Sequence, residues 1–276
     1  MRIALCNEVI ASLPFERQCV VAKELGYDGL EIAPMTLSDA PHTLPAARRT
    51  EIRRAAADAG IAITGLHYLL RAPAGLSITF ADKAVSARTK DVMRRLCDLA
   101  ADLGAGVVVH GSPDQRRLES GDEADGKKRG AECFAAVAPA AHSAGVIYCI
   151  EPLSPDQTQF VNTVAEAAEI VRAIGSPAVR TMIDCSSAGR SEAEPIPDLV
   201  RQWLPTGLIA HVHFNDPNRR GPGEGELAFA PILTALRDGG YDGMAAIEPF
   251  IYQPDGPTCA ARAIGYMRGL IEALPR

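Results

Sequence analysis

The chain has 276 residues, of which 47% are hydrophobic, and its formal net charge is -6. This hydrophobic fraction is enough for a sizeable buried core, and the negative charge argues against a non-specific binder of nucleic acid or of an anionic membrane surface. No apolar stretch approaches the roughly 20 residues that a membrane span needs, and the N-terminal residues form a strand-like run instead of a leader. We therefore expect a cytoplasmic protein without a membrane partner, whose seven cysteines form no C-x-x-C pair and are free thiols.

Short apolar runs alternate eight times with longer amphipathic segments, a pattern that is typical of β/α units around a parallel sheet. In chain order, the predicted strands are Ile3–Cys6, Gly29–Ala33, Ile61–His67, Gly106–His110, Val146–Glu151, Val179–Asp184, Leu208–His213 and Met244–Glu248. The predicted helices between and after them are Pro14–Leu25, Pro45–Ala59, Lys83–Leu103, a helix within Glu123–Ala144, a helix from an Asn162 cap to Ile174, Pro197–Trp203, Phe229–Arg237 and Cys259–Leu274.

Eight such units predict one (β/α)8 TIM barrel of the α/β class, and we expect residues 1–276 to form a single domain because no linker or composition break divides them. The alternative is a doubly wound open sheet. That fold would place a glycine-rich phosphate-binding turn after its first strand, and the segment NEVIASLP has no glycine. The long connection of residues 68–82 is typical of a loop that shapes a pocket.

An ionisable side chain lies at or just beyond the end of each predicted strand, where parallel strands converge on the active-site face of a barrel. These side chains are Glu8, Glu31, His67, His110, Glu151, Asp184, His213 and Glu248. Each of the first four, taken singly, is equally compatible with a hydrogen bond to a neighbouring loop. The last four combine three carboxylates with one imidazole, which indicates a divalent metal site because the acids would otherwise repel one another. Manganese is the favoured ion, with magnesium, cobalt and zinc as alternatives.

The segments IEPLSPDQTQFVNT, MIDCS, HVHFNDPNRRGPGEGEL and GYDGMAAIEPF resemble the xylose isomerase-like superfamily of sugar isomerases and epimerases, which includes ketose 3-epimerases and hydroxypyruvate isomerases. The resemblance covers essentially the whole chain. It implies that Glu151, Asp184, His213 and Glu248 bind the metal and that Glu151 and Glu248 also act as acid and base. It further implies a small carbohydrate or polyol-derived ketone as substrate, and it is compatible with a homo-oligomer.

The implied reaction is isomerisation or epimerisation, in which a glutamate removes the proton next to a carbonyl and the metal stabilises the enediolate that results. Re-protonation by a second glutamate from the opposite face inverts the carbon. The resemblance places Arg219 on a substrate oxygen. Where the ketose 3-epimerases have a glutamate and a histidine at the carbonyl end of the sugar, this chain has Gln157 and Ser187. We expect Gln157 to contact substrate, with His67 and His110 as replacement contacts.

Three alternatives remain open. A lyase or dehydratase would use the same enediolate to expel a β-hydroxyl from an inosose-like, dehydroshikimate-like or oxidised C-glycoside substrate. A DNA-repair enzyme of the endonuclease IV type would share the H-x-N-D fragment that begins at His213, but the further metal-binding histidines of that family are absent and the net charge disfavours a nucleic-acid partner. A non-catalytic barrel that only binds a metal or a sugar is the third.

Overall fold

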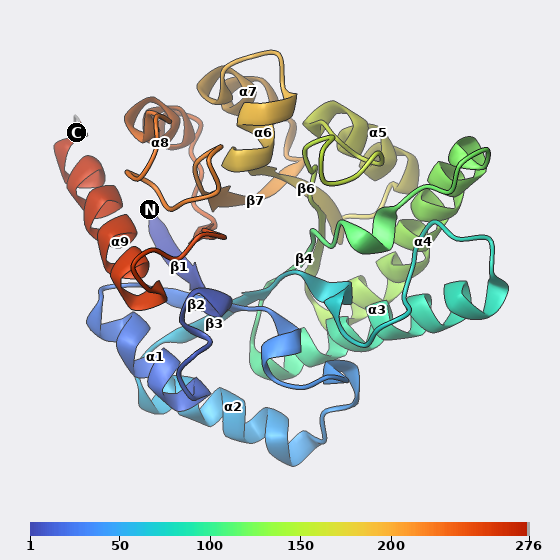
Figure 1. Ribbon diagram of the computed structural model, residues 1–276, viewed down its shortest axis with the longest axis horizontal. Coiled ribbons are helices and arrows are strands. Elements are labelled where there is room, and N and C mark those ends of the chain that lie inside the picture. Colours follow the sequence, from blue (N-terminus) through green and yellow to red (C-terminus); the bar gives the residue numbers. More distant parts are fainter. Residues whose placement is uncertain (275–276) are drawn as a thin grey trace.

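Eight parallel strands close into a barrel in the computed structural model, which describes residues 1–274 (Figure 1). Strands that follow one another in sequence are neighbours in the barrel, and the first strand pairs with the last. The strands are β1 (Arg2–Cys6), β2 (Gly29–Ile32), β3 (Ala62–Leu66), β4 (Val107–His110), β5 (Ile147–Ile150), β6 (Val179–Asp184), β7 (Ile209–Phe214) and β8 (Met244–Ile247). The predicted (β/α)8 barrel is therefore confirmed.

Helices form the outer layer around this barrel, as Figure 1 shows. They are α1 (Phe15–Glu24), α2 (Ala46–Asp58), α3 (Lys83–Leu103), α4 (Glu123–Ala144), α5 (Val164–Ile174), α6 (Cys185–Ser191), α7 (Ile196–Trp203), α8 (Phe229–Asp238) and α9 (Gly256–Ala273). Short 3-10 turns lie in the connections, including η1 (Asn7–Ile10) directly after β1. No helix of the described residues is long and apolar enough to cross a membrane.

Two helix starts differ from the prediction because other side chains cap them. Thr163, not Asn162, accepts the hydrogen bond from the Glu166 backbone at the start of α5. The Asn162 amide instead donates to the carbonyls of Leu153 and Thr158 and closes the loop before the helix. Helix α9 starts at Gly256, three residues before the predicted start, because Asp255 caps it.

Helix α6 was not predicted at all. It begins directly at the end of β6, where the Asp184 carboxylate accepts a hydrogen bond from the Ser187 backbone and so caps the helix. A predicted metal ligand thus has a second, structural part in the local fold.

Along each strand, successive side chains alternate between the barrel interior and the surrounding helices. Val107, Val109, Cys149 and Met182 form one core cluster inside the barrel, while Val108 belongs to the main core between strands and helices. All seven cysteines are free and buried, as expected from the sequence.

The strand register brings the carboxyl ends to one level. Asp184 of β6 lies opposite His213 of β7, and Cys6 of β1 lies opposite Glu31 of β2. Because neighbouring strands are less than 5 Å apart, side chains that point inward at this level must meet. This is the face of the barrel where the predicted site residues gather.

Candidate metal centre and active site

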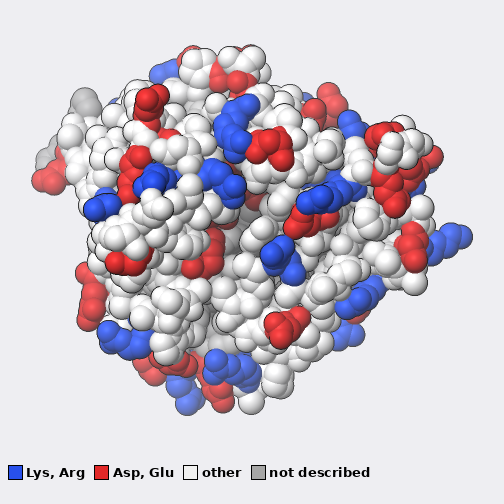
Figure 2. Space-filling view, in the orientation of Figure 1, with Lys and Arg blue, Asp and Glu red and all other residues white. Residues whose placement is uncertain are grey.

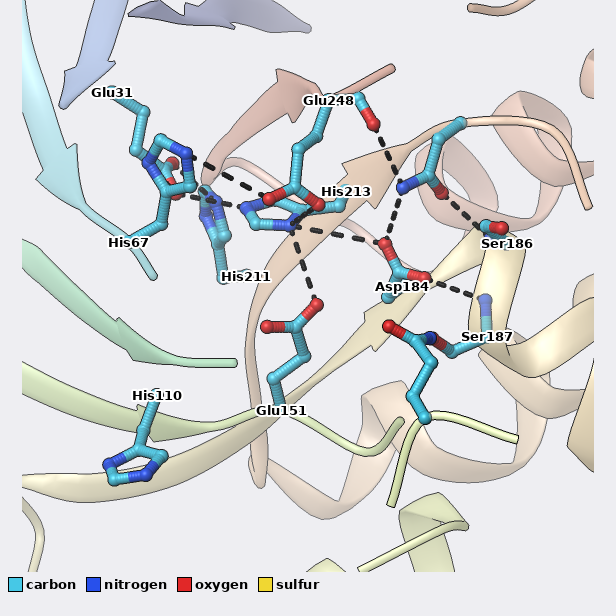
Figure 3. Close-up of polar contacts among 12 residues, drawn as sticks. Glu31, His67, His110, Glu151, Asp184, Ser186, Ser187, His211, His213 and Glu248 are labelled. Carbon is cyan, nitrogen blue, oxygen red and sulfur yellow. Dashed lines mark hydrogen bonds and ion pairs between the residues drawn. The ribbon is translucent and has the colours of Figure 1, made fainter. Parts of the chain in front are cut away.

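Four side chains from adjacent strand ends meet in the barrel mouth (Figure 3). Glu151 follows β5, Asp184 ends β6, His213 lies in β7 and Glu248 follows β8. One ligand atom from each lies within 4.8 Å of the ligand atoms of the other three, and all four residues are buried. Three carboxylates and one imidazole in this arrangement form a donor set that suits a divalent cation.

His213 is oriented by carboxylates on both sides of its ring. Its Nδ1 lies 3.0 Å from Glu248 Oε2 and 3.8 Å from Glu151 Oε1, and its Nε2 lies 2.9 Å from Glu31 Oε1. The other Glu31 oxygen lies 2.7 Å from Nε2 of His211. A buried carboxylate at Nε2 keeps the proton on that nitrogen, so Nδ1 is the atom left to bind a cation.

Asn215 fixes the Asp184 carboxylate from the far side. Its amide nitrogen donates to Asp184 Oδ2 at 2.7 Å and to the Glu248 carbonyl at 3.1 Å, and its amide oxygen accepts from the Ser186 backbone. The Ser187 backbone donates to Asp184 Oδ1 at 2.6 Å. Asn215 therefore ties together the ends of three strands, β6, β7 and β8.

The cluster carries more carboxylates than its surroundings can keep ionised. Burial, followed by repulsion from Glu151, raises the pKa of Asp184 from 3.8 to about 6. Burial also raises the pKa of Glu248 from 4.5 to about 8, even though the nearby His213 lowers it. A divalent cation would relieve this repulsion directly, so the residues present fit a bound metal ion.

A cavity of about 260 Å³ opens above the four donors, and Figure 2 shows a hollow near the middle of the face in view, with side chains of both charges around it. Glu151, Asp184 and Glu248 form part of its floor. The walls include Tyr68, Arg117, Gln157, Ser186, Ser187, Arg219 and Phe250. A larger groove of about 850 Å³ lies beside α6 and α7, but none of the four donors lines it, so we place the site in the smaller cavity.

A family model for the xylose isomerase-like TIM barrel matches residues 19–270. The chain belongs to the xylose isomerase-like TIM barrel family. It is 30% identical to the D-psicose 3-epimerase of Agrobacterium fabrum over 240 residues, which are 84% of this chain and 77% of that protein. It is 27% identical to the L-ribulose 3-epimerase of Mesorhizobium japonicum over 244 residues, which are 87% of this chain and 77% of that protein.

The fold of this xylose isomerase-like barrel is also that of solved structures. A D-psicose 3-epimerase from Clostridium cellulolyticum, whose crystal structure was determined with D-tagatose, matches it with a TM-score of 0.84 over 98% of this chain and 99% of that chain. The sequence identity in this comparison is 20%, so the likeness concerns the fold.

Arg219 reaches the cavity of this xylose isomerase-like barrel from the β7–α8 loop. Its guanidinium carbon lies 5.0 Å from the centre of the Phe250 ring, and its carbonyl accepts hydrogen bonds from the Phe250 and Ile251 backbones. Its φ is 69°, an unusual value for a residue with a side chain. The stacking and the two backbone bonds hold the loop in this conformation, with the Arg219 side chain beside the donors.

Gln157 also lines the cavity, where its amide nitrogen lies 3.0 Å from Ser154 Oγ and 3.4 Å from Ser187 Oγ. His67 lies next to the donors without lining the cavity. Its Nε2 is 2.8 Å from Glu8 Oε2 and 3.8 Å from Glu248 Oε1. Gln157 thus lies at the wall of the cavity and His67 beside the Glu248 carboxylate.

His110 lies away from the cavity, as Figure 3 shows. It ends β4 with its side chain on the helix side, where Nδ1 lies 2.7 Å from the Tyr148 hydroxyl and the ring packs edge-on against Phe134 of α4. Burial keeps the pKa of His110 well below its usual value, so the ring is neutral. The geometry therefore gives no support to the expectation that His110 contacts substrate.

Arg116 is a buried support that the sequence did not single out. It is fully buried in the β4–α4 loop and donates to the carbonyls of Glu151 and His110. Burial lowers its pKa to about 10. Arg116 thereby joins the ends of β4 and β5. In the sequence it stands in a run of basic and polar loop residues, where nothing distinguishes it from a solvated arginine.

Proposed function

We propose that this chain is a divalent-metal-dependent sugar isomerase or epimerase that moves a proton at the carbon next to a ketose carbonyl. The observation that carries the proposal is the position of two carboxylates: Glu248 and Glu151 lie on either side of His213 Nδ1, at 3.0 and 3.8 Å, and both face the cavity (Figure 3). The epimerase relatives support the reaction class.

Glu151, Asp184, His213 and Glu248 would hold the cation. When bound, the cation supplies a Lewis acid that stabilises negative charge on the substrate oxygens. A set of oxygen and imidazole donors suits manganese first, with magnesium, cobalt and zinc as alternatives.

The two glutamates divide the proton transfer between them. One carboxylate removes the proton from the carbon next to the carbonyl, and the other returns a proton to the opposite face of that carbon, which inverts its configuration. Glu151 and Glu248 both line the cavity, so both carboxylates can reach a substrate that is bound there. Asp184 is less suited to this step, because Ser187 and Asn215 already hydrogen-bond its two oxygens.

The cavity walls would bind and orient the sugar. Arg219 offers a rigid fork of donors to paired oxygens, and Gln157 and Ser187 offer uncharged donors and acceptors at the facing wall. His67, held by Glu8 behind Glu248, would act on the substrate from the edge of the site.

Product analysis tests this proposal. The manganese-loaded enzyme is incubated with a panel of ketohexoses and ketopentoses, and the products are identified by NMR. We expect an epimer or an isomer of at least one ketose, with no change in mass. A product that has lost water would instead assign the lyase reaction, in which the same proton abstraction expels a β-hydroxyl, and would refute the epimerase.

A further inference from the structure

A second cluster of possible metal ligands lies beside the first. Cys6, Glu8, His67 and Glu248 each offer one ligand atom, and these atoms lie within 4.8 Å of one another. Cys6 ends β1, Glu8 follows in η1, His67 follows β3 and Glu248 follows β8. The set contains one sulfur, one nitrogen and two carboxylate donors, a mixture that suits a borderline cation such as zinc or cobalt.

Glu248 belongs to both clusters and presents a different oxygen to each. Its Oε2 lies 3.0 Å from His213 Nδ1, while its Oε1 lies 3.8 Å from His67 Nε2. Figure 3 shows the carboxylate of Glu248 above the His213 ring, with His67 on the side of Glu31. Each carboxylate oxygen of Glu248 therefore faces a different cluster.

Cys6 gives an independent indication of a ligand. Its side chain is fully buried inside the barrel with Ala4 and Ala246, and no hydrogen bond to it is found within residues 1–274. The thiol nevertheless faces Glu8, His67 and Glu248, and it also lies within 4.8 Å of Glu31 and His213. Buried thiols commonly pack as small apolar groups, but this one is surrounded by carboxylates and imidazoles, and a cation would bind it as the thiolate.

The backbone that carries Cys6 and Glu8 is firmly held. Between them, the Asn7 side chain donates to Gln18 and Thr36 and accepts from the Ala33 backbone. Two donors of the second cluster, Cys6 and Glu8, are therefore held on a firmly bonded turn.

We propose that Cys6, Glu8, His67 and Glu248 form a second divalent-cation site, which takes zinc or cobalt and shares Glu248 with the first site. On binding, the Cys6 thiol and the His67 imidazolium release their protons to solvent, and the Glu8–His67 ion pair is replaced by bonds to the cation. If Glu248 is one of the two glutamates that transfer the proton in the proposed function, a cation at its Oε1 lowers turnover. This consequence rests on that proposal, but the second site itself does not.

Cobalt titration of the metal-free protein tests the site without any activity measurement. We expect two equivalents to bind, and the second to bring the near-ultraviolet charge-transfer band of a cobalt–thiolate bond. Cys6→Ser should abolish this band and keep the first equivalent. Glu8→Gln, an isosteric change at a partly exposed residue, should abolish the second equivalent together with its band. Cys97→Ser, which removes a buried thiol of α3, should keep both equivalents.

Binding of one equivalent without the band would overturn the second site, as would a band that persists in Cys6→Ser. Should Cys6→Ser fail to fold, Glu8→Gln decides alone, since thermal melts of the metal-free proteins show which variants are folded. A protein that binds two equivalents but epimerises no ketose would retain the second site and refute the proposed function.

Discussion

Glu31 contacts the proposed metal centre through another residue, His213. It is fully buried and holds Nε2 of His213 at 2.9 Å, so it sets which nitrogen of that ring faces the other three donors. We expect Glu31→Gln to weaken manganese binding by about 10- to 100-fold, because the neutral amide makes His213 a less basic ligand. Isothermal titration of the metal-free protein measures this affinity.

Glu192→Gln is the matched control, since this partly buried glutamate caps the Val164 backbone far from the donors. It should leave the affinity for manganese unchanged. Wild-type affinity in a correctly folded Glu31→Gln variant would show that Glu31 is only a packed partner of His211 and His213.

Single residues were predictable from the sequence to different degrees. The four donors were identified because each is an ionisable residue at the end of an otherwise apolar strand. Glu31 was recognised as one of these strand ends, but its bond to His213 joins residues 182 positions apart and depends on the closed barrel. Asn215 and Arg116 carry no such pattern, because their importance lies in which backbone groups they reach.

At the scale of elements, the β4–α4 loop approaches Glu151 so closely that only glycine fits at its first position. A Cβ at Gly111 would lie 2.6 Å from the Glu151 carboxyl carbon and would overlap one of its oxygens. We expect Gly111→Ala to displace this carboxylate and to lower kcat/KM by about 100-fold, as a shift of roughly 1 Å does in other active sites. Steady-state kinetics on the ketose that the enzyme converts measures the loss.

Gly106→Ala is the control. Gly106 precedes β4 as Gly111 follows it, and a Cβ at Gly106 would have no atom within 4 Å. It should change the free energy of unfolding by no more than about 0.5 kcal/mol and leave kcat/KM as it is. Equal activity of the two alanine variants would show that Glu151 has room to move without cost to the reaction.

The alternation of side chains along β4 explains why His110 lies outside the barrel. A histidine ends this strand in the sequence, and the expectation that His110 contacts substrate requires its side chain to point into the barrel. Val107 and Val109 point inward, so His110 must point outward by the alternation of a strand. Three consecutive valines conceal which residues of this strand face inward. Helix α6 is not evident from the sequence because its cap, Asp184, is itself a candidate metal ligand.

At the scale of the whole molecule, the alternation of eight β/α units was enough to predict the closed barrel, because this topology follows from the order of the elements.

The buried carboxylates and imidazoles in the barrel mouth should govern how the stability of the metal-free protein depends on pH. The pKa of His67 is raised from 6.5 to about 9, first by Glu8 acting against burial, and that of Glu248 is raised by burial from 4.5 to about 8. The folded, metal-free protein therefore holds these protons more tightly than the unfolded chain does.

The stability from His67 is fully present below pH 6.5 and is lost as the pH rises through 9, and that from Glu248 is lost as the pH rises through 8. We expect the Tm of the metal-free protein to fall between pH 6.5 and 9. Because a cation competes with protons for the donors, manganese should raise the Tm by at least about 2 °C more at the upper pH than at the lower. Scanning calorimetry with and without manganese checks this, and a manganese effect that is larger at low pH would contradict it.

Solvent exchange tests the central claim, that Glu151 and Glu248 move a proton at the carbon next to a ketose carbonyl. The manganese-loaded enzyme is incubated in deuterated water with the ketose panel, and deuterium is located by NMR and mass spectrometry. We expect deuterium at a single carbon beside the carbonyl of the converted ketose and its product, and a rate about 100- to 10,000-fold lower in metal-loaded Glu248→Gln. No deuterium in any ketose, or wild-type exchange in Glu248→Gln, would contradict the account.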